Sequence, residues 1–474
     1  MRTVFLIGYF LTWLAIPHVL LNKRRPVSTL AWIWSILLFP FFGPLAYIVF
    51  GVDRMTRKRI RQRERLDYSK RARAQQPPEI AETLEALERI GADEQRLIRQ
   101  LATINEIPPS TADEIRLLID AEAFYPALEK RIREARHHIH IQFFVYRADE
   151  YGKKILDALA DAARRGVIVR VLSDEIGSWQ TPEDFFKPLV DAGGKVGWFR
   201  TLHPWKNRFS LNLRNHRKVQ IFDGCVALVG GMNLGREYAS KDPRIGTWHD
   251  AQLEVTGNVV GHLQDQFAND WHFATDEEII DPIFYKRCGA SSRTIAQVIV
   301  GGPDLPREPM PKTIVSLLHF AKKRAWIATG YFVPDTMLLS ALQICAARGV
   351  DVRIIISQKS DHPFLVEIGR SYYEDLLSFG ARIFEYSRGL HHAKVMVIDG
   401  DWLMVGSANC DNRSLRLNFE LNVLARAPDE AAKMQAVFLE DFAASKEIKL
   451  EEFRARPRSR RLLEAAYRPL APLM

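Results

Sequence analysis

Histidine and lysine recur in an arrangement that suits chemistry on a phosphate group. Two segments follow the pattern H-x-K-x4-D-x6-G-x-x-N, and their histidines lie 176 positions apart. The polar members are His216, Lys218, Asp223 and Asn233 in the first copy and His392, Lys394, Asp399 and Asn409 in the second. A lysine can neutralise charge on phosphate oxygens while a histidine attacks or moves a proton. Two such copies predict one site with two histidines and two lysines.

The apolar stretch after each motif lysine predicts a strand that positions the pair. Val219–Phe222 and Val395–Ile398 each end at an Asp-Gly dipeptide, which is typical of a tight hairpin turn. Residues i and i+2 of a strand share a face, so the histidine and lysine of each copy should point the same way. Asp223 and Asp399 lie at the strand ends, off that parity, and we expect them to support the site or form the turn.

The paired motif resembles the phospholipase D superfamily, whose members carry two H-x-K-x4-D motifs on two similar halves. The resemblance implies a covalent phosphohistidine on one histidine and general acid and base catalysis by the other, with no metal or other cofactor. It implies His216 as the nucleophile and His392 as the acid and base. Asn233 and Asn409 would help the lysines to hold phosphate oxygens. Ser407 would add a hydroxyl, for which the first copy has a glycine.

Two acids downstream of the motifs complete the expected site. Asp250 and Glu420 follow their motif histidines by 34 and 28 positions, and each precedes an apolar, strand-like run. The resemblance implies that each acid orients the histidine of the opposite half, which pairs Asp250 with His392 and Glu420 with His216. The alternative is that both are solvent-facing acids at the starts of strands.

The body of the chain predicts two similar α/β halves. A helix that ends at Gly166 is followed by a buried strand, and the same step recurs at Gly349. Each half has the order β-α-β-α-β before its motif, which is typical of a mostly parallel sheet flanked by helices. We place the first phospholipase D-like half at 111–285 and the second at 286–450. The basic tail, 451–474, is either a surface anchor or an unstructured terminus.

Two apolar stretches, 3–21 and 28–50, predict an N-terminal transmembrane segment within residues 1–52. The pattern from Arg24 to Gly51 resembles the amino-terminal segment of bacterial cardiolipin synthases. A cleaved signal peptide is disfavoured because no small-residue cleavage site follows. Lys and Arg counts in the flanks favour a multi-pass protein of the bacterial inner membrane, with the catalytic body in the cytoplasm.

Charge is distributed unevenly along the 474 residues. The formal net charge is +9, and residues 53–73, in a predicted basic helical linker at 53–110, contribute +7 of it. The part that carries both motifs is mildly acidic, which argues against a nucleic-acid groove. Basic ends suit an anionic membrane surface as the partner.

The cysteines and the other histidines predict neither a metal site nor a disulfide. The cysteines, Cys225, Cys288, Cys345 and Cys410, are scattered without a CxxC pair, which weakly favours a reducing compartment. His137, His138 and His140 lie at a helix–strand junction without carboxylates. His391 adjoins His392 but lies outside the motif, so we assign it no role.

The resemblance implies a membrane-bound phosphatidyltransferase that makes cardiolipin from two phosphatidylglycerol molecules and releases glycerol. Hydrolysis of phospholipids, or less favourably of nucleic acid, by the same site is the alternative, because water and a lipid hydroxyl differ only as acceptors. A non-catalytic membrane scaffold is a third reading. Both H-x-K pairs are intact, which argues against it.

Overall fold

The computed structural model describes residues 2–22, 26–48, 77–200, 202–203, 208–209, 213–239, 246–286, 288–289 and 294–473. The basic stretch 53–73 of the predicted linker and the flank 23–25 lie outside these residues. The chain divides into two units. Met1–Glu64 and Arg200–Leu213 form the first, and Arg65–Phe199 and Arg214–Met474 form the second, which contains both motifs.

Three helices form the described part of the N-terminal stretch: α1 (Arg2–Asn22), α2 (Pro26–Leu38) and α3 (Phe42–Ala46). The hydroxyl of Tyr47 lies 2.9 Å from Nδ1 of His18 in α1. Pro17 lies within α1, and α2 and α3 are 13 and 5 residues long, short of the roughly 20 residues of a span. Across the described ranges, no helix has both the length and the apolar character needed to cross a bilayer. The predicted transmembrane segment is therefore wrong.

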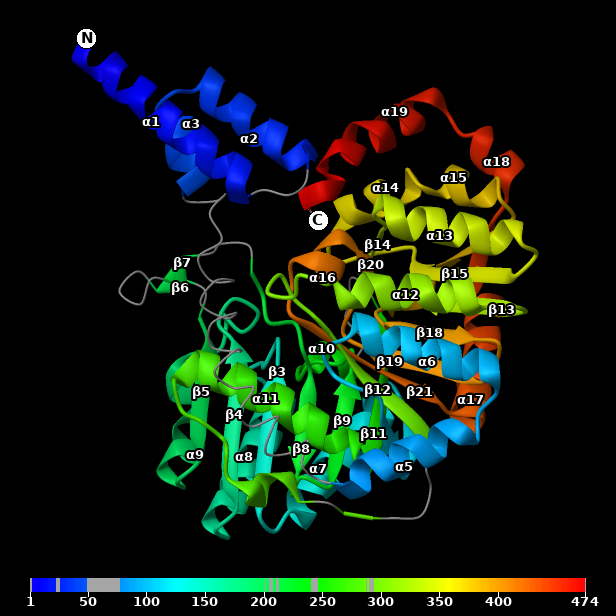
Figure 1. Ribbon diagram of the computed structural model, residues 1–474. Helices are drawn as coiled ribbons and strands as arrows, with labels where there is room; N and C mark the ends of the chain where they lie inside the picture. The colour runs from blue at the N-terminus through cyan, green and yellow to red at the C-terminus, as the bar shows by residue number, and fades with distance from the viewer. Residues whose placement is uncertain are drawn as a thin grey trace. The chain divides into compact units, whose positions relative to one another are not determined.

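A seven-stranded sheet forms the first half, in the order β2-β11-β9-β8-β3-β4-β5. Its strands are β2 (Ile115–Ile119), β3 (His138–Phe143), β4 (Ile168–Asp174), β5 (Lys195–Phe199), β8 (Val219–Phe222), β9 (Val226–Gly230) and β11 (Ala251–Thr256). Its helices are α7 (Asp120–Glu134), α8 (Glu150–Arg164), α9 (Lys187–Asp191) and α11 (Val259–Thr275). Ile139 and Ile141 of β3 join the apolar core with α7 and α8. His140 and Gln142 point to the other face, where they bond α11, the helix that crosses the sheet in Figure 1.

A nine-stranded sheet forms the second half, in the order β1-β12-β21-β19-β18-β13-β15-β16-β22. Its strands are β1 (Ser110–Ala112), β12 (Thr294–Gly301), β13 (Arg324–Ala328), β15 (Asp351–Ser357), β16 (Arg382–Tyr386), β18 (Val395–Ile398), β19 (Trp402–Gly406), β21 (Glu420–Arg426) and β22 (Ser445–Ile448). Its main helices are α12 (Pro309–Phe320), α13 (Thr336–Ala347), α14 (Pro363–Arg370), α15 (Tyr373–Leu377) and α17 (Pro428–Ala443). Earlier in the chain, α5 (Pro77–Glu88) is followed by α6 (Ala92–Ile104), which buries Leu97 and Leu101 in the core of this half.

The α/β class and the two similar halves are confirmed, but the sheets are mixed rather than mostly parallel. The predicted order is present as β3-α8-β4-α9-β5, whose strands pair in parallel, and β13, β15 and β16 do the same. After each motif lysine, however, the chain turns back in a hairpin, from β8 to β9 and from β18 to β19. A tight hairpin joins antiparallel strands. The Asp-Gly turns of the motifs therefore make the rest of each sheet largely antiparallel.

Two short backbone pairings join the halves next to the motifs. The strand β10 (Thr247–His249) runs parallel to β17 (Gly389–His391), and Asn215 forms a parallel bridge with Phe419. Each pairing lies one residue before a motif histidine in one half and one residue before a downstream acid in the other. The backbone therefore carries each acid to the histidine of the opposite half.

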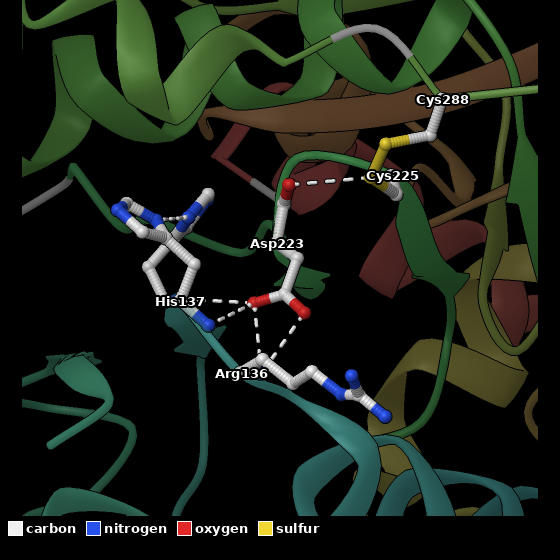
Figure 2. Close-up of a disulfide and its surroundings, with 6 residues drawn as sticks. Arg136, His137, Asp223, Cys225 and Cys288 are labelled. Carbon is white, nitrogen blue, oxygen red and sulfur yellow. Dashed lines mark hydrogen bonds between the residues drawn. A yellow bond between two sulfur atoms is a disulfide. The ribbon is translucent and has the colours of Figure 1, made fainter.

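Cys225 and Cys288 form a disulfide, with Cα atoms 5.1 Å apart and a separation of 63 positions in the sequence (Figure 2). The prediction of no disulfide is wrong. Cys225 lies in the β8–β9 turn, and Cys288 follows the short helix η4 (Pro282–Tyr285). Only the fold brings these segments together, and their spacing gives no signal of it. Cys345 and Cys410 are free and buried.

The basic tail folds onto the second half. It contains α18 (Leu450–Arg454), α19 (Arg458–Tyr467) and η5 (Arg468–Leu473). Arg460 donates to Glu367 of α14 at 2.9 Å, and Arg468 donates to Asp375 of α15 at 2.9 Å. Residues 450–473 are therefore folded, and the alternative of an unstructured terminus is excluded for them.

Candidate active site

The two motif histidines lie in extended segments immediately before β8 and β18, the strands predicted at Val219–Phe222 and Val395–Ile398. The backbone N–H of His216 donates to the carbonyl of Phe419 at 2.9 Å. The backbone N–H of His392 donates to the carbonyl of His249 at 2.7 Å. Each histidine is thus fixed by a backbone hydrogen bond from the other half.

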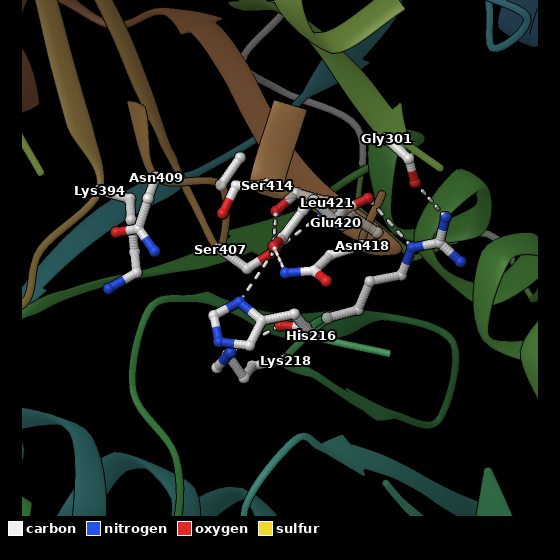
Figure 3. A network of polar contacts seen from close by, with 12 residues as sticks. His216, Lys218, Gly301, Lys394, Ser407, Asn409, Ser414, Asn418, Glu420 and Leu421 are labelled. Atoms are coloured by element: carbon white, nitrogen blue, oxygen red, sulfur yellow. Dashed lines mark hydrogen bonds and ion pairs between the residues drawn. The ribbon is translucent and has the colours of Figure 1, made fainter. Parts of the chain in front are cut away.

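His216 is oriented by Glu420. Its Nδ1 lies 3.1 Å from Oε2 of Glu420, and the hydroxyl of Ser407 donates to the same oxygen. The other carboxylate oxygen accepts from the side-chain amide of Asn418 at 3.4 Å. Figure 3 shows the imidazole turned toward Glu420 and Ser407, with Lys218 alongside. With Nδ1 held by the carboxylate, Nε2 is the nitrogen available to phosphorus.

His392 is oriented by Asp250. Its Nδ1 lies 2.7 Å from Oδ2 of Asp250 and 3.4 Å from the hydroxyl of Tyr238. The rings of Trp248 and Tyr331 lie 5.2 Å and 6.3 Å from the imidazole, centroid to centroid. This arrangement again leaves Nε2 for chemistry, next to the aromatic rings of Tyr238, Trp248 and Tyr331.

The two motif lysines are buried beside the histidines. Nζ of Lys218 donates to the carbonyl of His216 at 2.6 Å and lies 5.4 Å from the centre of the Phe144 ring. Nζ of Lys394 donates to the carbonyl of His392. Burial and the neighbouring Lys394 lower the pKa of Lys218 to about 7, although Glu420 opposes the shift. Burial lowers the pKa of Lys394 to about 8, against the opposing effect of Asp250 and Glu420.

Burial lowers the pKa of both motif histidines. Burial lowers the pKa of His216, with Lys218 adding to the effect and Glu420 opposing it. Burial and both lysines hold the pKa of His392 well below its usual value. Burial alone would raise the pKa of Glu420, but His216, Lys218 and Ser407 outweigh it and lower the pKa. Glu420 is therefore ionised at neutral pH, which keeps His216 a strong hydrogen-bond donor at Nδ1.

The motif aspartates and asparagines support the backbone around the site. Asp223 accepts from the N–H groups of residues 136, 137 and 138 (Figure 2). Asp399 accepts from those of residues 322, 323 and 324. Both aspartates have φ of 55°, in the left-handed region of the hairpin turn. Asn233 accepts from Val145 N–H at 3.0 Å, and Asn409 accepts from Tyr331 N–H at 3.4 Å.

Several contributors carry no motif signal in the sequence. Tyr238, Trp248 and Tyr331 surround His392. A Cβ atom on Gly330 would lie 3.2 Å from Cδ2 of His392 and 3.4 Å from Nζ of Lys394. Gly330 therefore keeps space open between the imidazole and the ammonium.

The glycine of the first motif and the serine of the second have different tasks. A Cβ atom on Gly231 would lie 2.2 Å from Oδ1 of Asp250, so the glycine makes room for this carboxylate. At the matching position, the hydroxyl of Ser407 donates to Glu420. The two motifs therefore differ at this position because Asp250 needs the space that a side chain would fill, whereas Glu420 accepts a hydrogen bond from the serine.

We expect Gly231→Ala to lower lipid transfer by about 10²-fold, because it displaces Asp250 and misplaces His392. Ser407→Ala is the matched comparison and should cost only a few-fold, because Glu420 keeps His216 and Asn418 as partners. Initial rates for both variants, with thermal unfolding to show that each is folded, check the prediction. Equal losses in the two variants would contradict it.

The residues that meet here form a site for an anion. Two lysines and two histidines converge, and the nearby acids are occupied in orienting the imidazoles. The arrangement suits a phosphodiester that binds between Lys218 and Lys394, with an imidazole nitrogen free on either side.

Two protein families and several full-length relatives match this chain. Residues 128–271 and 314–442 match the family described as cardiolipin synthase, phospholipase D-like domain, and residues 10–51 match the phospholipase D-nuclease N-terminal family. A cardiolipin synthase of Geobacillus thermodenitrificans is 35% identical over 459 residues, which cover 96% of this chain and 90% of that protein. Cardiolipin synthase A of Pseudomonas fluorescens is 33% identical, with coverage of 98% and 97%.

A solved structure shares the fold at low sequence identity. The phosphatidylserine synthase of Haemophilus influenzae superposes with a TM-score of 0.60 at 16% identity, covering 81% of this chain and 100% of that one. The matches to the two halves and to full-length relatives identify the duplicated catalytic fold. The chain is an enzyme of the phospholipase D superfamily and belongs to the cardiolipin synthase family.

Proposed function

We propose that this site transfers a phosphatidyl group from one phosphatidylglycerol to the hydroxyl of another, which yields cardiolipin and glycerol. The observation that carries the proposal is the cross-half arrangement of His216 with Glu420 and His392 with Asp250. It provides two imidazoles of fixed tautomer around a site with two ammonium groups. The full-length similarity to proteins named cardiolipin synthase supports the choice of substrate class.

In the first step, Nε2 of His216 attacks the phosphorus of the donor lipid. The N–P bond forms as the bond from phosphorus to the glycerol headgroup breaks. His392, whose pKa rises when the anionic phosphate binds beside it, carries the proton that it gives to the departing oxygen. Lys218 and Lys394 neutralise charge on the phosphate oxygens. Glu420 stabilises the positive charge that develops on His216.

In the second step, His392 removes the proton from a hydroxyl of the acceptor lipid. That oxygen attacks phosphorus, the N–P bond breaks, and His216 returns to its neutral form. The balance is two phosphatidylglycerols in and one cardiolipin and one glycerol out. Water as the acceptor would give phosphatidic acid instead, and the names of the full-length relatives disfavour that alternative.

The protein is membrane-associated, in line with its relatives and its N-terminal family match. We propose the bacterial inner membrane as its location and an anionic lipid surface as its partner, because its substrates reside there. The Lys and Arg counts favoured a cytoplasmic body. The Cys225–Cys288 disulfide argues against that side, because such bonds are rare in the cytosol.

The dependence of kcat/KM on pH should be bell-shaped. His216 must be neutral to attack, and its lowered pKa places the acid limb below pH 6.5. Lys218 must be protonated to bind phosphate, and its pKa of about 7 places an alkaline limb near pH 7 in the free enzyme. Lys218→Arg keeps its charge at all these pH values and should weaken the alkaline limb. A limb unchanged by this variant would contradict the assignment.

The proposed function is tested in detergent–lipid micelles that contain phosphatidylglycerol labelled in its headgroup glycerol. We expect a lipid with two phosphates and release of labelled glycerol in equal amounts. Accumulation of phosphatidic acid without the two-phosphate lipid would show that water is the acceptor. The protein would then be a phospholipase D with the same two-step chemistry.

A further inference from the structure

A second cluster of imidazoles and carboxylates lies next to the catalytic pair and takes no direct part in the proposed reaction. Oδ2 of Asp441 lies 3.1 Å from Nε2 of His249 and 3.1 Å from Nε2 of His391. The donor atoms of these three residues all lie within 4.8 Å of one another. His391 and Asp441 are buried, and His249 is largely so.

This donor set and geometry suit a zinc ion. Zinc in proteins takes histidine nitrogen and carboxylate oxygen at about 2.0–2.2 Å in a tetrahedral arrangement, so its ligand atoms are about 3.3 Å apart. Two of the three edges here already measure 3.1 Å. We propose that His249, His391 and Asp441 bind a zinc ion, with the fourth position of the tetrahedron left for water.

Asp120 does not bind the ion itself but orients one of its ligands, His249. Its two carboxylate oxygens lie 2.8 Å and 2.9 Å from Nδ1 of His249. A carboxylate on the far nitrogen of a histidine ligand fixes the ring and the tautomer that leaves Nε2 for the metal. Among the described residues, no Lys or Arg lies within ion-pair distance of Asp120 or Asp441, so the two negative charges match the charge of one zinc ion.

The proposed ion would join the two halves at the point where they build the active site. Asp120 and His249 come from the first half, and His391 and Asp441 come from the second. The carbonyl of His249 accepts from the backbone N–H of His392 at 2.7 Å. A carboxylate oxygen of Asp120 accepts from the backbone N–H of Asp250 at 2.8 Å. By fixing His249 and Asp120, zinc would also fix the backbones of His392 and Asp250, which bond to them.

A proton on His249 is the competing occupant. It would bridge Asp120 and Asp441 in the same geometry, but it would balance only one of their two negative charges. The two occupants differ in metal content, and that difference can be measured without any assay of lipid transfer.

The test uses the full chain in detergent, purified without a polyhistidine tag and freed of loosely held metal by gel filtration. We expect one zinc ion per chain by elemental analysis. Cobalt added to the stripped protein should give the visible absorption of a tetrahedral site. Asp441→Asn and His249→Gln should lose the bound metal, and Asp120→Asn should keep it with about 10–100-fold weaker affinity.

His216→Asn is the matched control, because it removes a buried histidine from the catalytic site and should retain zinc in full. The wild-type result decides the proposal even if a variant fails to fold. A folded wild-type chain that neither contains zinc nor takes up cobalt would overturn it. Loss of metal in a His216→Asn chain that thermal unfolding shows to be folded would also overturn it, because the ion would then belong to the catalytic site. Neither result depends on which lipid the enzyme uses.

Discussion

His216→Ala is expected to lower phosphatidyl transfer by about 10⁴-fold or more, because it removes the group that forms the bond to phosphorus. Nδ1 of His216 is held by Glu420 at 3.1 Å, so Nε2 is the nitrogen that attacks phosphorus, and it is lost in this variant. Transfer from phosphatidylglycerol labelled at its phosphorus, which stays on the enzyme when the headgroup glycerol leaves, measures the loss. Acid-labile label on the protein, sought after rapid denaturation, should be absent in this variant.

His392→Ala should behave differently, because it removes the proton donor and acceptor but leaves the nucleophile. We expect a fall of about 10²–10⁴-fold in turnover and a phosphatidyl-enzyme that accumulates on His216. His319→Ala, which removes an exposed histidine outside both motifs, is the control for the mutation procedure. If label accumulates on His216→Ala instead of His392→Ala, the roles of the two histidines are reversed.

Arg217→Met is expected to destabilise the protein by about 3–5 kcal/mol, the usual cost of removing one partner from a buried ion pair. Nη1 of Arg217 lies 2.7 Å from Oδ1 and 2.8 Å from Oδ2 of Asp270, and the two side chains are 1% and 0% exposed. The same guanidinium donates to the carbonyls of Glu420 and Gly301. The midpoint of denaturant unfolding, followed by tryptophan fluorescence, measures the shift.

Arg164→Met provides the matched control for this substitution. Its partner Asp161 is 66% exposed and Arg164 is 59% exposed, so the change should be within about 0.5 kcal/mol. The double variant Arg217→Met with Asp270→Asn should be less destabilised than Arg217→Met alone, because the buried charge is removed with its partner. Equal shifts for Arg217→Met and Arg164→Met would contradict a special role for the buried pair.

Local features of the chain follow from its sequence. The apolar runs after each lysine form the predicted strands β8 and β18, and the Asp-Gly pairs form the predicted turns. The β-α-β-α-β order of each half is visible because helices end at glycines such as Gly166 and Gly349, both of which have positive φ. These features depend on neighbours in the chain, and periodicity and turn chemistry report them directly.

Other features lie beyond local patterns. An Asp-Gly turn predicts a hairpin, but the sense of a whole sheet depends on which distant strands pair with that hairpin. Apolar content predicted a membrane span, yet the helices of residues 2–48 do not provide one among the described parts of the chain. The pairing of Cys225 with Cys288 depends on the packing of η4 beside the β8–β9 turn. His391 lacked a role because its partners, His249 and Asp441, are distant in sequence.

The sequence by itself determined the reactive groups, their order and the duplication that supplies them twice. Only the tertiary structure decided how the two copies become one site. Parallel backbone bridges, of β10 with β17 and of Asn215 with Phe419, place each acid beside the histidine of the other half. The physical reason is that such bridges satisfy backbone hydrogen bonds between segments about 140–200 positions apart, and no local pattern in either segment specifies its partner.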